Sequence, residues 1–436
     1  MEKVSYKLKK LEGLNSKFLS RDKLNLCFRG FYNVKDKYTL HEILCKNKCL
    51  QKADLNIVHF HNGTGGGVLT VIKNLLKFST ASNVRNHVIH AVNPAVVPAY
   101  KIEPMEGAVS QQLFYYNAQN NFYHTCRQLA KLLPDKNAII VAHNWAELGM
   151  VSNLGLQNKV VQVLHGNYDY YYELAIKNNK AIDAFVCIAK SIQQKLTNLL
   201  PQRKDDIDYL RFPVADSKCG TKMHNSFNVV FIGRCTEEKG YHLLPSIAAS
   251  LAGKGIQANW HIAGELGEAE NKLYKWDDEI TVNFYGNIAN EKVMTLLCEM
   301  DVLVLPSIAE GMPVNIIEAM KAGVVPVVND LPGGIQELVL QNETGITITG
   351  NQAEGFADAI MKIAVNNNDR QYMAANARKL ANEMFDPISN TVAIENLYAA
   401  LHDRLPKKKQ AVKVYGSRLD YPWIGNCITK SIRRRF

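Results

Sequence analysis

One stretch, Asp301–Gly345, constrains the fold of this chain more than any other. It contains an apolar run typical of a buried parallel strand (Val302–Pro306), a polar loop, a helix that opens near Pro313, and a second apolar strand (Val324–Val328). The order strand, loop, helix, strand is the βαβ unit of a doubly wound sheet, whose ligands bind outside the carboxyl ends of the strands. Glu310 follows the first strand, so its carboxylate is predicted to face a ligand.

Glu310 and Glu318 form a carboxylate pair, and such pairs can carry out glycoside hydrolysis. The spacing excludes that chemistry, because eight helical residues rise about 12 Å, whereas hydrolytic pairs lie about 5 Å or about 6.5–9.5 Å apart. The two side chains suit one elongated ligand held at two points, with a sugar at one and a ribose at the other. Pro313 favours a first helical turn, and the free amides near Val314 can bind a phosphate. A solvated helix face with two incidental glutamates is the alternative.

The string EGMPVNIIEAMKAGVVPVV from Glu310 to Val328, followed by Gly333, Gly334 and Glu337, closely resembles the E-x7-E signature of retaining glycosyltransferases of family 4. The resemblance covers roughly Leu55–Leu401. It implies an α/β fold of the GT-B class, with two Rossmann-like, doubly wound parallel-sheet domains that face a central cleft. It also implies transfer of a sugar from a nucleotide-diphosphate sugar, with retention of configuration and without a metal or other cofactor.

The first domain opens with a strand that runs into a glycine loop, Leu55–Gly67, where the backbone can approach a phosphate or sugar closely. The loop lacks both the order G-x-G-x-x-G and a P-loop lysine, so alone it is a weak signal. The family has a glycine loop at this place, which implies donor contacts at Gly65 and Gly66. His59 and His61 suggest a metal pair, but without a third ligand nearby, core or loop histidines are the stronger interpretation.

Two later strands are followed by histidines, His143 and His165, at the end of the sheet where ligands bind. A satisfied loop histidine is the alternative at either position. His165 resembles the family's histidine near the donor sugar. We expect the acceptor to contact His143 and the tyrosine-rich run that begins at Tyr168, whose rings can stack on sugars or begin a packed helix.

The second domain opens with the strand Asn228–Ile232, and Arg234 and Lys239 follow it in a pattern that resembles the family's G-R-x4-K-G motif. A nucleotide diphosphate gains negative charge as the glycosidic bond breaks, and a guanidinium plus an ammonium can stabilise that charge without a metal. The implied catalytic residues are His165, Arg234, Lys239 and Glu310, and the implied donor-binding residues are Gly65, Gly66, Asn287, Ile288, Gly311, Met312, Pro313, Val314 and Glu318.

The apolar pattern, together with the family resemblance, implies the domain boundaries. These are an N-terminal extension at 1–50, an acceptor domain at 51–216, a donor domain at 217–385, a crossover helix at 386–403 and a basic tail at 404–436. We expect the extension to be a solvated, partly helical arm. No run approaches the roughly 18 apolar residues of a spanning helix, and the first residues lack the apolar core of a secretory signal. The expected location is the cytoplasm.

The net charge of +10 is concentrated in the tail. From Arg404 to Phe436, ten Lys or Arg residues accompany one acid, Asp420. Trp423 and Ile428 lie among these cations, a composition that suits an anionic membrane surface. A disordered solubilising tail and nucleic-acid binding are the alternatives, of which we expect no nucleic-acid partner. The preferred interpretation is a peripheral position on the cytoplasmic face of the membrane.

Two other patterns suggest metal or redox chemistry. The nine cysteines have no metal-binding spacing and no regular framework, so we expect reduced thiols. Asp206-Ile-Asp208 has the D-x-D form that metal-dependent transferases of another fold use. It precedes the expected strand Tyr209–Phe212 in a charged linker, so a solvated charge run is the stronger interpretation, and no metal is expected.

Together these features favour a glycosyltransferase that moves a sugar from a UDP- or GDP-linked donor to a hydroxyl of a glycan or lipid-linked acceptor in surface polysaccharide or lipopolysaccharide biosynthesis. No carboxylate of the first domain presents itself as a nucleophile, so the leaving phosphate is expected to take the acceptor's proton. A phosphorylase or synthase that uses a sugar phosphate, and a non-catalytic scaffold, are the alternatives. A nicotinamide oxidoreductase is disfavoured by the missing dinucleotide fingerprint.

Overall fold

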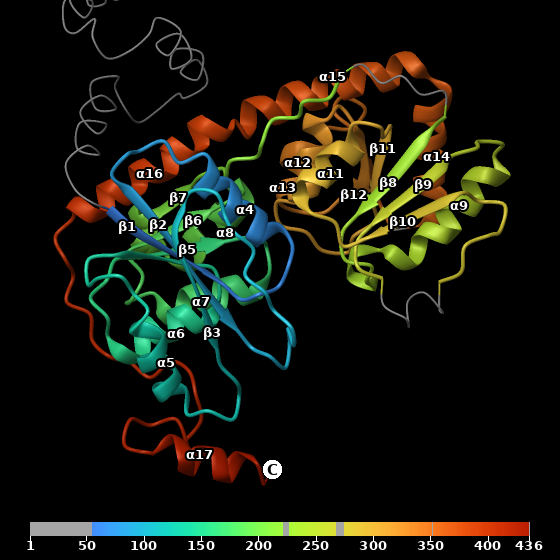
Figure 1. The fold of residues 1–436 in the computed structure, drawn as a ribbon. Coiled ribbons are helices and arrows are strands. Elements are labelled where there is room, and N and C mark those ends of the chain that lie inside the picture. The colour runs from blue at the N-terminus through green and yellow to red at the C-terminus, as the bar shows by residue number, and fades with distance from the viewer. Residues whose placement is uncertain (1–54, 221–225, 267–273, 351, 436) are drawn as a thin grey trace, which may run out of the picture. The chain divides into compact units, whose positions relative to one another are not determined.

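Two parallel β-sheets form the framework of the chain (Figure 1). The computed structural model describes residues 55–220, 226–266, 274–350 and 352–435, and the arm predicted for residues 1–50 lies outside these ranges. The first sheet has the order β3-β2-β1-β4-β5-β6-β7 and the second has the order β10-β9-β8-β11-β12-β13. The prediction of two doubly wound parallel sheets is therefore confirmed.

The first sheet holds the strands β1 (Leu55–His61), β2 (Val84–Val92), β3 (Ala108–Tyr115), β4 (Ile139–Ala142), β5 (Val160–Leu164), β6 (Ala184–Cys187) and β7 (Ile207–Tyr209). Its helices are α4 (Gly67–Lys77), α5 (Phe122–Ala130), α6 (Trp145–Leu154), α7 (Asp169–Asn178), α8 (Lys190–Leu199) and the short η2 (Pro201–Asp206). The predicted strand at 209–212 is displaced, because Ile207 and Tyr209 pair with Phe185 and Cys187, where β6 ends.

The second sheet holds β8 (Asn228–Ile232), β9 (Asn259–Ala263), β10 (Val282–Gly286), β11 (Val302–Leu305), β12 (Val325–Asn329) and β13 (Ile346–Ile348). Its helices are α9 (Leu244–Gly253), α11 (Asn290–Leu297), α12 (Val314–Lys321), α13 (Gly334–Leu338), α14 (Ala353–Val365) and α15 (Asn367–Met384), with the short η3 (Glu237–Lys239) and η4 (Tyr241–Leu243). Every residue of β11 and β12 is buried, as expected for apolar strands with both faces covered.

Both sheets reverse their strand order at one point, between β1 and β4 in the first and between β8 and β11 in the second. In open parallel sheets ligands bind in the crevice at the carboxyl ends of the strands beside such a reversal. The loops that begin after His61, Ala142, Ile232 and Leu305 are therefore the positions from which side chains can reach a ligand.

A buried lysine fastens the segment that links the two sheets. The ammonium of Lys321 is fully buried and donates to the carbonyl of Val214 at 2.7 Å, to Asp216 Oδ1 at 2.8 Å and to the carbonyl of Phe385 at 2.9 Å. These contacts use all three donors of the ammonium, and burial lowers its pKa below the usual value. Lys321 thus joins the linker to the end of α15.

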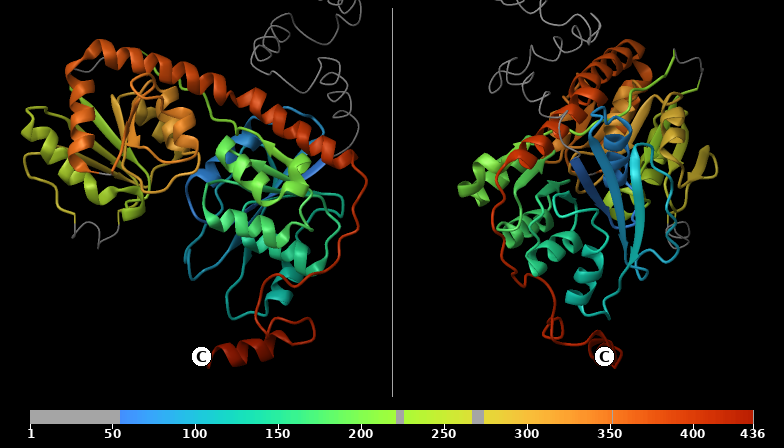
Figure 2. Two further views of the ribbon diagram at one scale, coloured as in Figure 1. Left: turned by 180° about the vertical axis from the view of Figure 1, so that it is seen from behind. Right: turned by 60° about the vertical axis from the view of Figure 1, so that its left-hand side comes forward.

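The helix α16 (Pro387–Asp403) then packs on the first domain (Figure 2). Glu395 Oε1 accepts a hydrogen bond from Ser79 Oγ at 2.5 Å, and the Tyr398 ring meets His59 edge-on with centroids 6.5 Å apart. The helix α16, which follows the second domain in the chain, therefore contributes to the core of the first domain.

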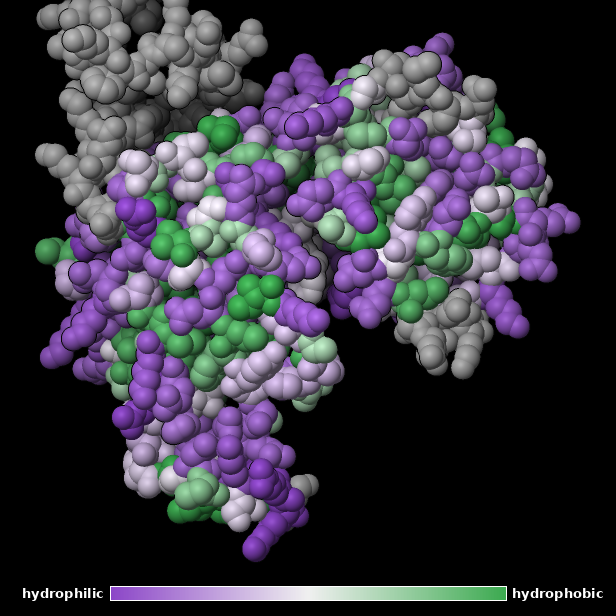
Figure 3. Space-filling model, viewed as in Figure 1, coloured by the Kyte–Doolittle hydropathy of each residue, from purple (hydrophilic) through white to green (hydrophobic). Residues whose placement is uncertain are grey.

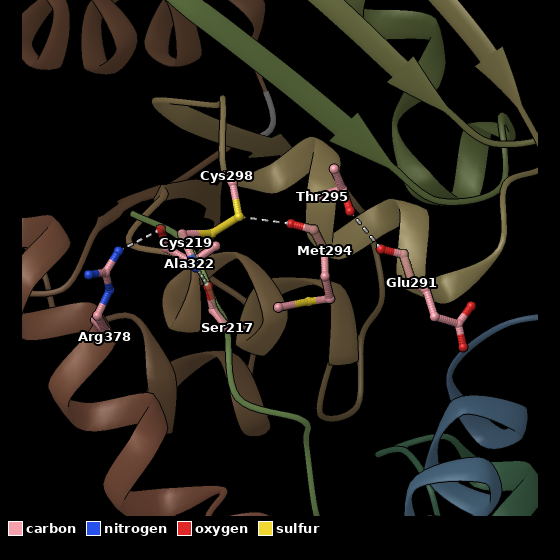
Figure 4. The surroundings of a disulfide bond; sticks show 8 residues. All are labelled: Ser217, Cys219, Glu291, Met294, Thr295, Cys298, Ala322 and Arg378. Carbon is pink, nitrogen blue, oxygen red and sulfur yellow. Dashed lines mark hydrogen bonds between the residues drawn. A yellow bond between two sulfur atoms is a disulfide. The ribbon is translucent and has the colours of Figure 1, made fainter. Parts of the chain in front are cut away.

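Two of the nine cysteines form a disulfide, so the expectation of reduced thiols is wrong for this pair. Cys219, within the segment that links the two sheets, is bonded to Cys298, which follows α11, with a Cα–Cα distance of 5.1 Å (Figure 4). A separation of 79 residues hides this proximity in the sequence. Cys126, Cys187 and Cys235 are buried thiols outside this disulfide, and Cys427 is an exposed one.

The basic tail is packed on the first domain as far as Arg433, which donates to the carbonyl of Asn120 at 2.6 Å, so the disordered alternative is wrong for this segment. Lys409 pairs with Asp183 at 2.6 Å, and both side chains are 4% exposed. Further along, the amide of Val412 donates to the carbonyl of Ser152 at 2.8 Å.

The D-x-D aspartate Asp206 is likewise no freely solvated charge, because it pairs with Arg203 and Arg404 and its side chain is 18% exposed. Among the described residues, no helix is long and apolar enough to cross a bilayer.

Removing the disulfide is expected to destabilise the chain. The bond restricts the unfolded state by closing a loop of 79 residues, a constraint worth about 2–4 kcal/mol. Cys219→Ser, Cys298→Ser and reduced wild type should therefore melt at lower temperature than the oxidised wild type, whereas the control Cys427→Ser should not. Equal melting of wild type with and without reductant, followed by circular dichroism, would contradict the disulfide.

Candidate active site

The switch point of the second sheet carries an ion pair between two of the predicted site residues. Lys239, at the end of η3 after β8, places its Nζ 2.7 Å from Oε1 of Glu310, in the loop after β11. The lysine side chain is 16% exposed and the glutamate side chain 7%. Because the pair is largely shielded from solvent, loss of one partner leaves the other charge unpaired at a cost well above that of an exposed pair.

Arg234 lies in the same loop but is not held against Glu310. Its guanidinium contacts Glu238 at 3.3 Å, and its side chain is 64% exposed. Exposed pairs of this kind contribute at most about 1 kcal/mol. The guanidinium therefore remains available to an anion that approaches the Lys239–Glu310 pair.

The helix α12 begins beside this pair, with Pro313 as its N-cap and no side chain that caps its first turn. Asn315 Nδ2 donates to the carbonyl of Ile232 at 2.6 Å, which fixes the start of the helix at the end of β8. Val314 is buried, and Glu318 in the next turn is 4% exposed. The uncapped amides are the groups of this helix suited to an anion.

A close backbone contact joins the Glu310 loop to the loop after β5. Gly311 bridges to Gly166, and a Cβ atom at Gly311 would lie 2.2 Å from the carbonyl oxygen of His165. The amide of Gly334 donates to the Gly311 carbonyl at 2.9 Å from the other side. Only glycine fits at position 311, and this contact brings His165 next to the loop that carries Glu310.

The predicted histidines His143 and His165 contact each other. His143 Nδ1 lies 2.7 Å from His165 Nε2, so one ring nitrogen donates and the other accepts. The ring of His59 stacks on His143 with centroids 6.1 Å apart. Burial lowers the pKa of His59 and of His165 to about 4 and, together with the neighbouring histidines, that of His143 well below its usual value. His143 is 1% exposed, so its side chain supports His165 and does not face solvent.

Tyr168, predicted to contact the acceptor, has a pKa that responds to the carboxylates at the Lys239–Glu310 site. Burial first, and then the carboxylates of Glu310 and Glu238, raise the pKa of its phenol. The side chain of Tyr170, two residues on, faces the other site described next. Within this tyrosine run, Tyr168 is therefore close to the Glu310 carboxylate and Tyr170 lines the pocket. The run also begins the helix α7.

A pocket of about 340 Å³ lies at the switch point of the first sheet. Its lining combines the loop after β1, the loop after β4 and several aromatic rings, and includes His61, Asn62, Thr64, Tyr116, Asn144, Trp145, Glu147 and Tyr170. Tyr116, Trp145 and Glu147 were not predicted from the sequence. Aromatic and polar groups in one concave site suit a sugar-sized ligand.

Glu147, a residue not predicted from the sequence, places a carboxylate at the pocket of the first domain. Its Oε1 accepts hydrogen bonds from the amides of His143 at 2.7 Å and Asn144 at 2.5 Å, and burial raises its pKa. The signal in the sequence was a capping box, Asn144-x-x-Glu147, at the start of α6. Because Oε1 is committed to the backbone, Glu147 suits ligand binding better than covalent attack.

The glycine loop separates β1 from α4. Gly66 caps the helix with φ of 111°, a conformation that favours glycine, and no atom lies within 4 Å of a Cβ built at Gly65 or Gly66. Gly67 approaches Val314 of α12, since a Cβ there would lie 3.4 Å from Val314 Cγ2. The loop thus lies beside the start of the helix that carries Glu318.

The remaining predicted residues, Asn287 and Ile288, follow β10 at the edge of the second sheet. In the order of the sheet, β9 lies between β10 and β8, whose loop carries Lys239, and β9 and β8 lie between β10 and β11, whose loop carries Glu310. Met312 is buried in the Glu310 loop. Among the described residues, no three His, Cys, Asp or Glu side chains gather to hold a metal ion.

Comparison with known proteins finds a family resemblance in the second half of the chain. The family model described as glycosyl transferases group 1 matches residues 217–380, the part that holds the second sheet. The putative colanic acid biosynthesis glycosyltransferase WcaL of Escherichia coli is 31% identical over 144 residues, 30% of this chain and 34% of WcaL. The glycogen synthase of Mycobacterium tuberculosis H37Rv is 25% identical over 236 residues, 50% of this chain and 54% of the synthase. The chain thus spans about a third to a half of these relatives.

The fold matches a solved structure over nearly the full length of that structure. Anabaena Alr3699/HepE, in complex with UDP and glucose, superposes with a TM-score of 0.62 at 17% identity, covering 79% of this chain and 99% of HepE. With the two parallel sheets, this likeness confirms the predicted GT-B fold.

The buried histidines are expected to make stability fall in mild acid. Unfolded His59 binds a proton below about pH 6.5, whereas folded His59 does so only near pH 4, so protonation favours the unfolded state between these values. At about 1.4 kcal/mol per pKa unit, His59 accounts for a loss of about 3 kcal/mol across this window.

The variant His59→Leu removes the titrating group and should flatten the decline measured by urea denaturation from pH 7 to about pH 4. His124→Gln, at an exposed position on α5, is the matched control and should keep the wild-type slope. An unchanged slope in His59→Leu would contradict a neutral, buried His59.

Proposed function

We propose that the chain is a retaining glycosyltransferase of family 4 that moves a sugar from a nucleotide-diphosphate donor, UDP- or GDP-linked, to a hydroxyl of a glycan or lipid-linked acceptor. The observation that carries the proposal is the shielded Lys239–Glu310 pair at the switch point of the second sheet, with Arg234 beside it. An ammonium, a guanidinium and a carboxylate at one crevice suit a ligand that combines a diphosphate with sugar hydroxyls.

In this proposal the donor lies along the loops after β8 and β11. Arg234 and Lys239 neutralise the diphosphate, and no metal is required. Glu310 then accepts hydrogen bonds from hydroxyls of the transferred sugar. The amides of Gly311, Met312 and Val314 donate hydrogen bonds to the donor, and Pro313, which has no amide hydrogen, begins the helix. Glu318 holds the ribose, and the backbone at Asn287 and Ile288 meets the base.

The sugar moves when the bond between its anomeric carbon and the diphosphate oxygen breaks. The acceptor hydroxyl attacks the same face of the sugar, and the departing phosphate oxygen takes the hydroxyl proton, so charge and atoms balance. Cations at the diphosphate stabilise the charge that develops on the leaving group. His165 borders this position. Its backbone carbonyl lies next to Gly311, and its imidazole is held by the hydrogen bond with His143.

The acceptor is proposed to occupy the pocket of about 340 Å³ in the first domain. Trp145 and Tyr170 offer rings that can stack on a sugar, and Glu147 offers a buried carboxylate. We assign His143 to positioning His165 and place Tyr168 with the donor. The relative WcaL is named for colanic acid biosynthesis, which supports a role in polysaccharide assembly. We extend the proposal to surface polysaccharide or lipopolysaccharide assembly.

A synthase that extends a storage glucan, or one that uses a sugar phosphate, is the second candidate, because one relative is a glycogen synthase. A screen of acceptors against the donor that binds separates the two, since the synthase transfers glucose to glucan or to a sugar phosphate.

Nucleotide binding tests the proposal. A nucleotide or nucleotide sugar at 100 times its dissociation constant should stabilise the fold by about 2.7 kcal/mol, measured as a rise in melting temperature with chelator present. Glu318→Ala and Arg234→Ala should abolish the rise, and the control Glu343→Ala, at an exposed position, should keep it. No rise with any nucleotide, or a rise that survives both site variants, would contradict the donor site.

Stereochemistry tests retention separately. With the bound donor identified, proton NMR of the first sugar released by slow hydrolysis should show the donor's own anomeric configuration. Release of the opposite anomer would show that the enzyme inverts configuration.

A further inference from the structure

The tail ends in a fixed structure that presents apolar side chains to solvent. Asn121, the N-cap of α5, donates through Nδ2 to the carbonyls of Leu419 and Ile424, both at 2.9 Å. Asp420 is 3% exposed and accepts from the amide of Phe122 at 2.6 Å. The helix α17 (Asn426–Arg433) is thereby held on the first domain, with Thr429 fully buried against it.

Two apolar side chains of this terminal segment are exposed. Trp423 is 75% exposed and Ile428 is 53% exposed. Trp423 stacks on Tyr421 with centroids 4.4 Å apart and the planes at 19°, and the ammonium of Lys413 lies 3.6 Å from the centre of the Tyr421 ring. The indole is thus supported from behind, and hydrophobic atoms appear among hydrophilic ones at the end of the tail (Figure 3).

Exposed cations flank these apolar side chains in the sequence. Arg418, Arg434 and Arg435 are exposed. The tail's one acid, Asp420, is buried and engaged by Arg433 at 2.5 Å, so it does not neutralise them. An exposed indole and isoleucine next to unneutralised arginines match the interface of an anionic bilayer, where apolar groups enter the acyl boundary and cations meet the headgroups.

We propose that the surface formed by Trp423, Ile428 and the arginines at 418, 434 and 435, named here the tail surface, docks on an anionic lipid bilayer. A bilayer suits it better than a nucleic acid, because exposed Trp423 and Ile428 can enter the acyl boundary of a bilayer while the arginines meet its headgroups. This proposal is separate from glycosyl transfer and does not depend on which sugar the chain transfers.

The position of the tail surface gives docking a consequence for the pocket. Tyr415, in the same tail, meets the ring of Trp145 with centroids 5.9 Å apart, and Trp145 lines the pocket of the first domain. A docked tail therefore ties the wall of that pocket to the membrane. On the proposed function, this arrangement suits an acceptor that is linked to lipid.

Vesicle sedimentation of the full chain tests the proposal. Vesicles of phosphatidylcholine with phosphatidylglycerol should bind the protein, vesicles of phosphatidylcholine alone should not, and high salt should release it. The double variant Arg434→Gln and Arg435→Gln should weaken binding about twentyfold or more, since each charge near an anionic surface contributes about fivefold. Trp423→Ala with Ile428→Ser should weaken it at least tenfold.

Matched variants outside the tail serve as controls. Val365→Ser removes a 68% exposed apolar residue of α14, and Lys379→Gln removes an exposed cation of α15, and both should bind as wild type. All variants should melt at the wild-type temperature, because the changed side chains are exposed. The proposal is overturned if wild type ignores anionic vesicles or if the tail variants bind them equally well. It is also overturned if these variants instead abolish a dimer or RNA binding in the absence of lipid.

Discussion

The close approach of two backbone segments at Gly311 governs the rest of the site. A side chain at this position would collide with the carbonyl of His165 at 2.2 Å, so the loop after β11 can meet the loop after β5 only because Gly311 has no Cβ atom. The amide of Gly334 closes the same contact from the far side. As a result, the loop that carries His165, after β5 of the first sheet, lies against the loop that carries Glu310, after β11 of the second sheet.

Residues near one another in sequence were predictable, and those joined by the fold were not. The run from Val302 to Val328 defines strand, loop, helix and strand by its apolar pattern, and the structure has all four there. The Lys239–Glu310 pair was predicted only as two separate contacts, because 71 residues separate them. The same holds for the Cys219–Cys298 bond. Glu147 was missed because its carboxylate is first a helix-capping group, and its position in the pocket depends on the neighbouring β1 loop.

The tail shows how composition can mislead when its charges have different roles. Lys409 and Arg433 are used in pairs with Asp183 and Asp420 that fasten the tail to the first domain. The remaining exposed arginines and Trp423 face outward. A count of basic residues cannot separate the fastening charges from the free ones, because the distinction lies in which of them meet a buried carboxylate.

Hydrogen–deuterium exchange with and without nucleoside diphosphate, in chelator, tests the central claim that the donor binds the second sheet's switch point. We expect UDP or GDP to slow exchange at residues 233–240, 286–289 and 311–318, because bound phosphate and base occupy these amides. Exchange around the first-domain pocket, at residues 62–64 and 144–147, should stay unchanged with the nucleotide alone. Slowed exchange confined to the first-domain pocket, or none anywhere with either nucleotide, would contradict this account of the site.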